Sequence, residues 1–270
     1  MTVVRLHGLG ASSAFWRPVT RELDGVVRTV VPDLLGFGTS LRLGTHFHLD
    51  DQAAAVIRLV ERHSAGPVVL GAHSYGAAVA VTVARERPDL VRRLVLVAPA
   101  AFADARQARE RIGGRSRIAR RTMDGSPVAD LACGAMCLLR RPLTALAPRA
   151  AARSSPDIPP DVARDSVIHV WPAYRDGLYS LLQANPLPAW LAHPLLPTTV
   201  VFAEGDQTVL AANLAPLLGP DVEVVRMGGS HALPLEHPAD VARAILSSKD
   251  ERAAGPCQRH SRSTASRSHR

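Results

Sequence analysis

The chain has 270 residues, 47% of them apolar and 21% charged, which is the composition of a folded globular protein large enough for one α/β core with an inserted subdomain. Its longest apolar stretch, residues 94–103, is too short to cross a membrane, and no signal peptide is visible, so we expect a cytoplasmic protein without a membrane partner. The formal charge of +8 does not predict nucleic-acid binding, because half of it lies in residues 249–270 and no aromatic residues interleave with the arginines between residues 106 and 121.

Strand-like and helix-like segments alternate along the chain. Short apolar runs predict strands at residues 2–6, 26–31, 68–72, 94–98, 199–203 and 222–227. Apolar residues at helical spacing predict helices between them, at residues 13–23, 50–62, 76–87, 210–218 and 239–246. This alternation predicts an α/β fold with a mostly parallel, doubly wound sheet, in which functional residues collect at the carboxyl ends of the strands.

The alternation stops between residues 102 and 197, a segment too long for a simple connection and without strand-like runs. We therefore expect a helical cap insertion at 102–197, with the core formed by residues 1–101 and 198–248. Within the insertion, Trp171 and Tyr174, with Tyr179 and Trp190, are expected either to line a substrate pocket or to pack the cap on the core. The arginines between residues 106 and 121 are either a solvated helix face or an attraction for an anionic substrate.

The tail, residues 249–270, has six basic and two acidic residues and is rich in Ser, Arg and His. Because it lacks apolar periodicity, we expect it to be disordered.

A serine stands where an apolar strand-like run ends and a helix-like run begins, in the sequence Ala72-His73-Ser74-Tyr75-Gly76. Small residues two before and two after Ser74 allow the sharp strand-to-helix turn that raises a nucleophilic hydroxyl at a helix N-terminus. The usual pattern has Gly at the first of these positions, where this chain has Ala72. The turn predicts a nucleophile at Ser74 if other segments supply a base and an acid.

Polar or glycine-rich loops follow several other predicted strands. A glycine-rich turn at residues 7–10 follows the first strand and can direct backbone N–H groups into a pocket. Asp206 follows the strand at 199–203, and His231 follows the strand at 222–227. The chain order Ser74, Asp206, His231 therefore offers a nucleophile, an acid and a base at one edge of the sheet.

In this order and spacing, the motifs resemble those of the α/β-hydrolase fold family over residues 2–247. The resemblance rests on the turn at 7–10, a second glycine-punctuated loop at 33–40, the Ser74 turn, and the Asp206 and His231 loops. It implies that His231 is the base for Ser74 and that Asp206 orients His231. It also implies an oxyanion hole formed by the backbone N–H groups of Leu9 and Tyr75.

The sequence leaves other roles open for several titratable residues. Asp104, which follows another strand, is the alternative acid, although the Asp-x-x-Val spacing at Asp206 matches the family better. We expect His73 to be a packed neighbour of the serine, His7 to brace the glycine-rich turn, and Asp33 to fix its own loop.

No metal site or cofactor is predicted. Three cysteines, Cys133, Cys137 and Cys257, have no metal-type spacing with histidines. His46 and His48 are close in sequence, but nothing nearby completes a site.

Relatives usually carry a β-hairpin before the His-Gly turn, whereas the first strand-like run here begins at residue 2. We expect the fold to lack those first two strands, or the start codon to be misplaced. The strand at 26–31 would then be a sheet edge, which needs cover.

These features predict a serine hydrolase that cleaves an ester or related acyl bond of a small to medium hydrophobic substrate through an acyl-Ser74 intermediate. The same residues resemble those that other members of the family use for C–C bond hydrolysis, thioester cleavage, lyase or cyclisation chemistry. Dehalogenases and epoxide hydrolases of the family use Asp as nucleophile, so Ser74 argues against them. A non-catalytic ligand-binding protein is the remaining alternative. The expected partner is a small molecule.

Overall fold

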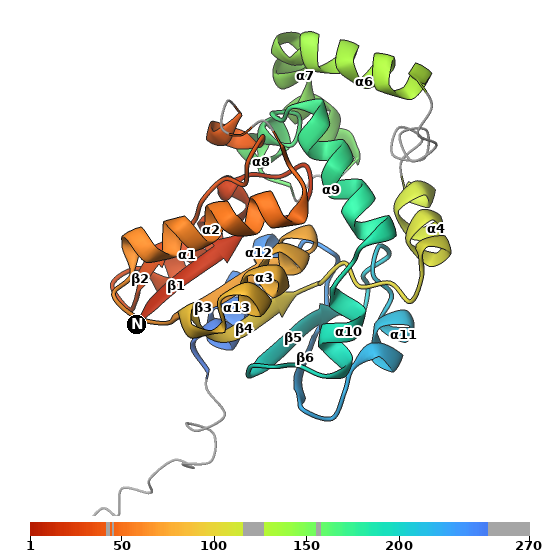
Figure 1. Cartoon of the computed structure of the whole chain (residues 1–270). Coiled ribbons are helices and arrows are strands. Elements are labelled where there is room, and N and C mark those ends of the chain that lie inside the picture. Colours follow the sequence, from red (N-terminus) through yellow and green to blue (C-terminus); the bar gives the residue numbers. More distant parts are fainter. Residues whose placement is uncertain (42–43, 45, 116–126, 155–157, 248–270) are drawn as a thin grey trace, which may run out of the picture.

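The computed structural model describes residues 1–41, 44, 46–115, 127–154 and 158–247, and Figure 1 shows their arrangement. Six strands form one parallel sheet in the order β2-β1-β3-β4-β5-β6, which confirms the predicted α/β fold. The strands are β1 (Thr2–Leu6), β2 (Arg28–Val30), β3 (Val68–His73), β4 (Val91–Val97), β5 (Thr198–Ala203) and β6 (Val222–Met227). The tail expected to be disordered lies outside the described residues.

The central strands are apolar on both faces, because helices cover both. Leu70 of β3 and Leu96 of β4 pack in one hydrophobic cluster, whereas Val69 and Val95 pack in a second cluster on the opposite face. This alternation follows from the two-residue repeat of a strand and explains why these segments read as continuous apolar runs. The short strand β2 is an edge of the sheet, as predicted, and β6 is the other edge.

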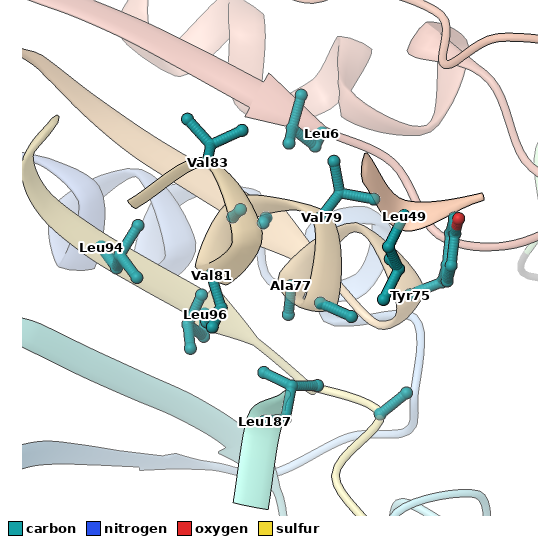
Figure 2. Close-up of a cluster of buried hydrophobic side chains, with 14 of the residues drawn as sticks. Leu6, Leu49, Tyr75, Ala77, Val79, Val81, Val83, Leu94, Leu96 and Leu187 are labelled. Atoms are coloured by element: carbon teal, nitrogen blue, oxygen red, sulfur yellow. The ribbon is translucent and has the colours of Figure 1, made fainter. Parts of the chain in front are cut away.

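Helices form a layer on each face of the sheet. One layer holds α2 (Leu49–His63), α3 (Tyr75–Glu86) and α10 (Leu187–Ala192), and Figure 2 shows Val81 of α3 beside Leu96 of β4 and Val79 on the side of Leu6 of β1. The other layer holds α1 (Arg17–Leu23), α12 (Leu233–Glu236) and α13 (Pro238–Leu246). Shorter pieces are α11 (Ala211–Leu214) and the 3-10 turns η1 (Ser13–Trp16), η2 (Gly38–Ser40), η3 (Pro88–Leu90) and η4 (Ala215–Leu217).

Most of the remaining helices gather beyond one end of the sheet (Figure 1). They are α4 (Ala105–Arg115), α6 (Pro127–Leu138), α7 (Arg140–Ser154), α8 (Pro160–Asp165) and α9 (Trp171–Gln183). Helix α10 lies within the predicted insertion but packs with α3 in the core cluster, so this part of 102–197 covers the sheet. In the described part of the chain, no helix is long and apolar enough to cross a membrane.

Candidate active site

Ser74 lies on a strained turn between β3 and α3. Its backbone has φ 52° and ψ −117°, a left-handed φ that residues other than glycine rarely adopt. Gly76 permits the turn, since a Cβ at this position would lie 2.5 Å from the carbonyl oxygen of His7 and 2.8 Å from that of Leu6. The small residue two positions after the serine is therefore required by close approach to β1.

We predict that Gly76→Ala destabilises the fold by about 1–3 kcal/mol or more, because the atoms that the new methyl group meets are backbone and cannot swing away. Urea denaturation measures the change. Gly66→Ala is the matched control, since nothing lies within 4 Å of a Cβ there. Equal midpoints for Gly76→Ala and wild type would contradict the close approach.

The structure brings Ser74, His231 and Asp206 together, although they come from three separate loops. Nε2 of His231 lies 3.0 Å from Oγ of Ser74, and Nδ1 of His231 lies 2.6 Å from Oδ2 of Asp206. Ser74 follows β3, Asp206 follows β5 and His231 follows β6, so the carboxyl ends of three parallel strands supply the set. This geometry allows a proton to pass from the serine hydroxyl to the imidazole while the carboxylate holds the ring.

Asp206 is buried, with 1% of its surface exposed, yet it is held as a carboxylate. Burial by itself raises the pKa of this group, but the hydrogen bond and charge of His231 and two backbone N–H groups outweigh it, so the pKa is lowered. The N–H groups belong to Thr208 and Val209 and donate to Oδ1 at 2.7 and 2.9 Å. The second oxygen, Oδ2, therefore remains for His231.

Asp104, the alternative acid, has a different role in the structure. It is exposed and accepts a hydrogen bond of 2.7 Å from the backbone N–H of Gln107 at the start of α4. This is an N-terminal capping contact of a helix. Asp206 and not Asp104 contacts His231.

The glycine-rich turn after β1 lies beside Ser74. Tyr75 is the first residue of α3, so its N–H has no acceptor within the helix, and Leu9 lines the same cavity as Ser74. His7 braces this turn as predicted. Its Nδ1 bonds the carbonyl oxygen of Gly8 at 2.8 Å, and its Nε2 accepts from the N–H of Leu34 at 3.0 Å.

Asp33 fixes its own loop, also as predicted. Its carboxylate accepts hydrogen bonds from the backbone N–H groups of Ser13 and Thr39 and from the Thr39 hydroxyl, at 2.6 to 2.7 Å. Burial raises the pKa of Asp33, but the bonds from Thr39 and Ser13 more than offset it and leave the pKa lowered.

Beside Ser74 lies a cavity of about 570 Å³, which residues of α7 and α8 also line. Its walls are largely apolar. They comprise Gly8, Leu9, Gly10, Ala11, Phe15, His73, Ser74, Leu143, Leu146, Ala147, Ala150, Ile158, Val162, Ala163, Ser166, Val167 and His231. Among the described residues, this lining holds no arginine, lysine or carboxylate.

Trp171 and Tyr174, considered as pocket residues, pack against each other and against neighbouring residues. Trp171 is buried, and its ring stacks with that of Tyr174 at 6.0 Å between centroids. Tyr174 also stacks on His169 and lies against Gly10. Their aromatic surface is used in packing, so neither ring is among the residues that line the cavity.

Helix α7 supplies pocket residues that the sequence interpretation missed. Leu143, Leu146, Ala147 and Ala150 all line the cavity. Their spacing of three, four and seven residues is the signal that could have found them, since it places them on one helix face. The surrounding Ala and Pro residues weaken that signal.

The arginine cluster does not line the described cavity. Arg106 pairs with Glu110 on the exposed surface of α4, whereas Arg117, Arg120 and Arg121 lie outside the described residues.

Among the described residues, no three His, Cys, Asp or Glu side chains form a group that could hold a metal ion. His46 and His48 are exposed, and Cys137 is half-buried with its Sγ 3.7 Å from the carbonyl oxygen of His169. The side chains of Cys133 and Cys257 lie outside the described part of the structure.

The sequence matches the model of the alpha/beta hydrolase family over residues 3–244. The chain belongs to the alpha/beta hydrolase family. Lipase LipV of Mycobacterium tuberculosis is 35% identical to this alpha/beta hydrolase over 108 residues, which are 40% of this chain and 41% of the lipase. A haloalkane dehalogenase of Bradyrhizobium diazoefficiens is 32% identical over 95 residues, 35% of this chain and 31% of the dehalogenase. The chain thus matches less than half the length of either relative.

A solved structure supports the same fold over most of the chain. The crystal structure of E-2-(acetamidomethylene)succinate hydrolase superposes with a TM-score of 0.70, covering 91% of this chain and 90% of that one at 24% sequence identity. At this identity the likeness concerns the fold alone. Together with the family match, it assigns the alpha/beta hydrolase fold to most of this chain.

Proposed function

We propose that the protein is a serine hydrolase that cleaves an ester or related acyl bond through an acyl-Ser74 intermediate. The observation that carries the proposal is the pair of short contacts that link Ser74 through the imidazole of His231 to Asp206, next to an apolar cavity. A serine hydroxyl is a weak nucleophile at its own pKa and needs such a base. The proposal also includes a cytoplasmic location, a small-molecule partner and no cofactor.

The chemistry proceeds in two halves. Oγ of Ser74 attacks the acyl carbon while Nε2 of His231 takes the hydroxyl proton, and the Asp206 carboxylate stabilises the imidazolium. The N–H groups of Leu9 and Tyr75 stabilise the oxyanion, a contribution that is typically worth a hundredfold to a thousandfold in rate per donor. His231 then protonates the leaving alcohol as the C–O bond breaks. Water, deprotonated by His231, attacks the acyl-Ser74 ester, and the acid leaves as the proton returns to Ser74.

The cavity favours a neutral, hydrophobic acyl group. Apart from His73, Ser74, Ser166, His231 and two glycines, its described walls are leucine, isoleucine, valine, phenylalanine and alanine side chains, and they hold no arginine or lysine to pair with a substrate carboxylate. A carboxylate buried there without a partner would carry a large desolvation cost. The name of the succinate hydrolase, by contrast, describes a substrate with two carboxyl groups.

A panel of p-nitrophenyl esters tests this substrate class. We predict that kcat/KM rises from acetate to octanoate, because each buried CH₂ is worth about 0.8 kcal/mol, or roughly fourfold. The hemisuccinate ester, which carries a carboxylate, should react at least tenfold more slowly than the butyrate ester of similar length, and Ser74→Ala supplies the background. Preference for the hemisuccinate, or no gain with chain length, would contradict an apolar acyl site.

The same panel separates other chemistry at Ser74. Thioesters and vinylogous diketones are included because the family resemblance also covers thioester and C–C bond cleavage. Ser74 is the wrong nucleophile type for the dehalogenase reaction. Ligand binding without turnover, unaffected by Ser74→Ala, would mark a binding protein.

A further inference from the structure

The base of the candidate site, His231, lies on the loop between β6 and α12. Gly228, Gly229 and Ser230 are exposed, and Gly229 has φ 102°. The carboxylate of Glu236 accepts from the N–H of Ser230 at 2.7 Å and from its hydroxyl, which anchors the loop before the histidine. After His231 the chain enters α12, whose first turn donates to the carbonyl oxygen of Ala232. A bond to the carbonyl of His231 itself would anchor the peptide that carries the ring 3.0 Å from Ser74.

His73, the residue before the serine, supplies that anchor. Its Nε2 lies 2.8 Å from the carbonyl oxygen of His231. Because a carbonyl only accepts, Nε2 carries the hydrogen and donates. His73 is 5% exposed, ends the buried strand β3, and packs its ring against Phe15 at 4.5 Å between centroids. The donor is therefore held rigidly.

The other nitrogen of His73 is consistent with this tautomer. Its Nδ1 is buried, has no hydrogen-bond partner among the described residues, and lies against Gly8, where a Cβ would approach it to 2.9 Å. Burial and the nearby His231 lower the pKa of His73 to about 3, so the ring stays neutral at ordinary pH. This matters because the two rings are 4.9 Å apart, and a second cation there would oppose protonation of His231.

We propose that His73 is a positioning residue, whose Nε2–H holds the main chain of His231 and thereby sets the distance between the base and the nucleophile. The inference rests on the proposed hydrolase function. It assigns His73 no contact with the reacting atoms. Its effect is on kcat, since misplacing a catalytic group by about 1 Å can cost roughly a hundredfold in rate.

Three substitutions at His73 test the proposal by steady-state kinetics on p-nitrophenyl butyrate. His73→Gln places an amide N–H near the position of Nε2 and should keep kcat within about fivefold of wild type. His73→Asn carries the same amide as His73→Gln on a side chain one CH₂ shorter, so its nitrogen lies near the position of Nδ1 and not of Nε2. We expect His73→Asn and His73→Phe to lose about a hundredfold in kcat, with KM changed less than about threefold.

His193→Phe, at an exposed histidine, is the control for the aromatic substitution. Melting temperatures are measured for all variants, so that rates are compared between folded proteins. Equal kcat for the Gln and Asn variants, full activity of His73→Phe, or an effect confined to KM would each overturn the positioning role. An inactive wild-type enzyme would instead refute the proposed function, so the two failures are distinguishable.

Discussion

Replacing Ser74 with alanine is expected to lower kcat for ester hydrolysis by about a million-fold, the scale seen when the nucleophile of such a set is removed. The substitution deletes only Oγ, the atom that lies 3.0 Å from Nε2 of His231. Alanine keeps the Cβ that already stands on the left-handed turn, so the free energy of unfolding should change little. Initial rates on the butyrate ester and urea denaturation measure the two quantities.

Ser64→Ala is the matched control for this substitution. Ser64 is remote from the cavity, and its hydroxyl bonds the carbonyl oxygen of Gly66 in a surface loop, so kcat should stay at the wild-type value. If folded Ser74→Ala kept more than about a hundredth of the wild-type kcat, Ser74 would not be the nucleophile.

Asp206→Asn is expected to reduce kcat by about ten-thousand-fold at neutral pH, as amide replacement of the acid does in comparable sets. An amide nitrogen near Oδ2 would donate to Nδ1 of His231 and force the hydrogen onto Nε2. The ring could then no longer take the proton of Ser74. Asp104→Asn is the matched control and should keep full activity, because Asp104 only caps α4.

The same variant has a pH-dependent effect on stability. The pKa of Asp206 is lowered in the folded protein, so its charged interactions stabilise the fold above the unfolded pKa and are lost as the pH falls through the folded pKa. The difference in free energy of unfolding between wild type and Asp206→Asn should therefore narrow below about pH 4. Urea denaturation from pH 7 to pH 3 measures it. A difference that widens in acid, or an Asp104→Asn enzyme as impaired as Asp206→Asn, would contradict the role of Asp206.

The sheet was predictable from sequence because its strands are buried on both faces. Continuous apolar runs and helical spacing placed β1, β3 and α3 to within a residue or two. Boundaries failed where polar residues are buried. The charged residues Arg92 and Arg93 led to a predicted start at residue 94, whereas β4 begins at Val91. In the structure Arg93 is only 8% exposed and donates to the carbonyl oxygen of Ile245. Similarly, Pro18 near the start of α1 separates the single predicted helix into η1 and α1.

The three central residues of the site were predictable for a different reason. Ser74, Asp206 and His231 each follow a predicted strand, and the carboxyl ends of parallel strands meet at one edge. The walls of the cavity were not predictable in this way. No local sequence pattern determines where a helix such as α7 lies relative to the sheet, so nothing in the sequence indicates that Leu143 and Leu146 line the cavity.

A fluorophosphonate reagent gives the most direct measurement of the central claim, that Ser74 is a nucleophile activated by His231. Such reagents phosphonylate an activated serine and leave an unactivated hydroxyl untouched. Intact-mass spectrometry of the folded protein should show a single adduct, located by peptide mapping on Ser74 and absent from Ser74→Ala. No adduct on active wild-type protein, or an equal adduct on Ser74→Ala, would contradict the account.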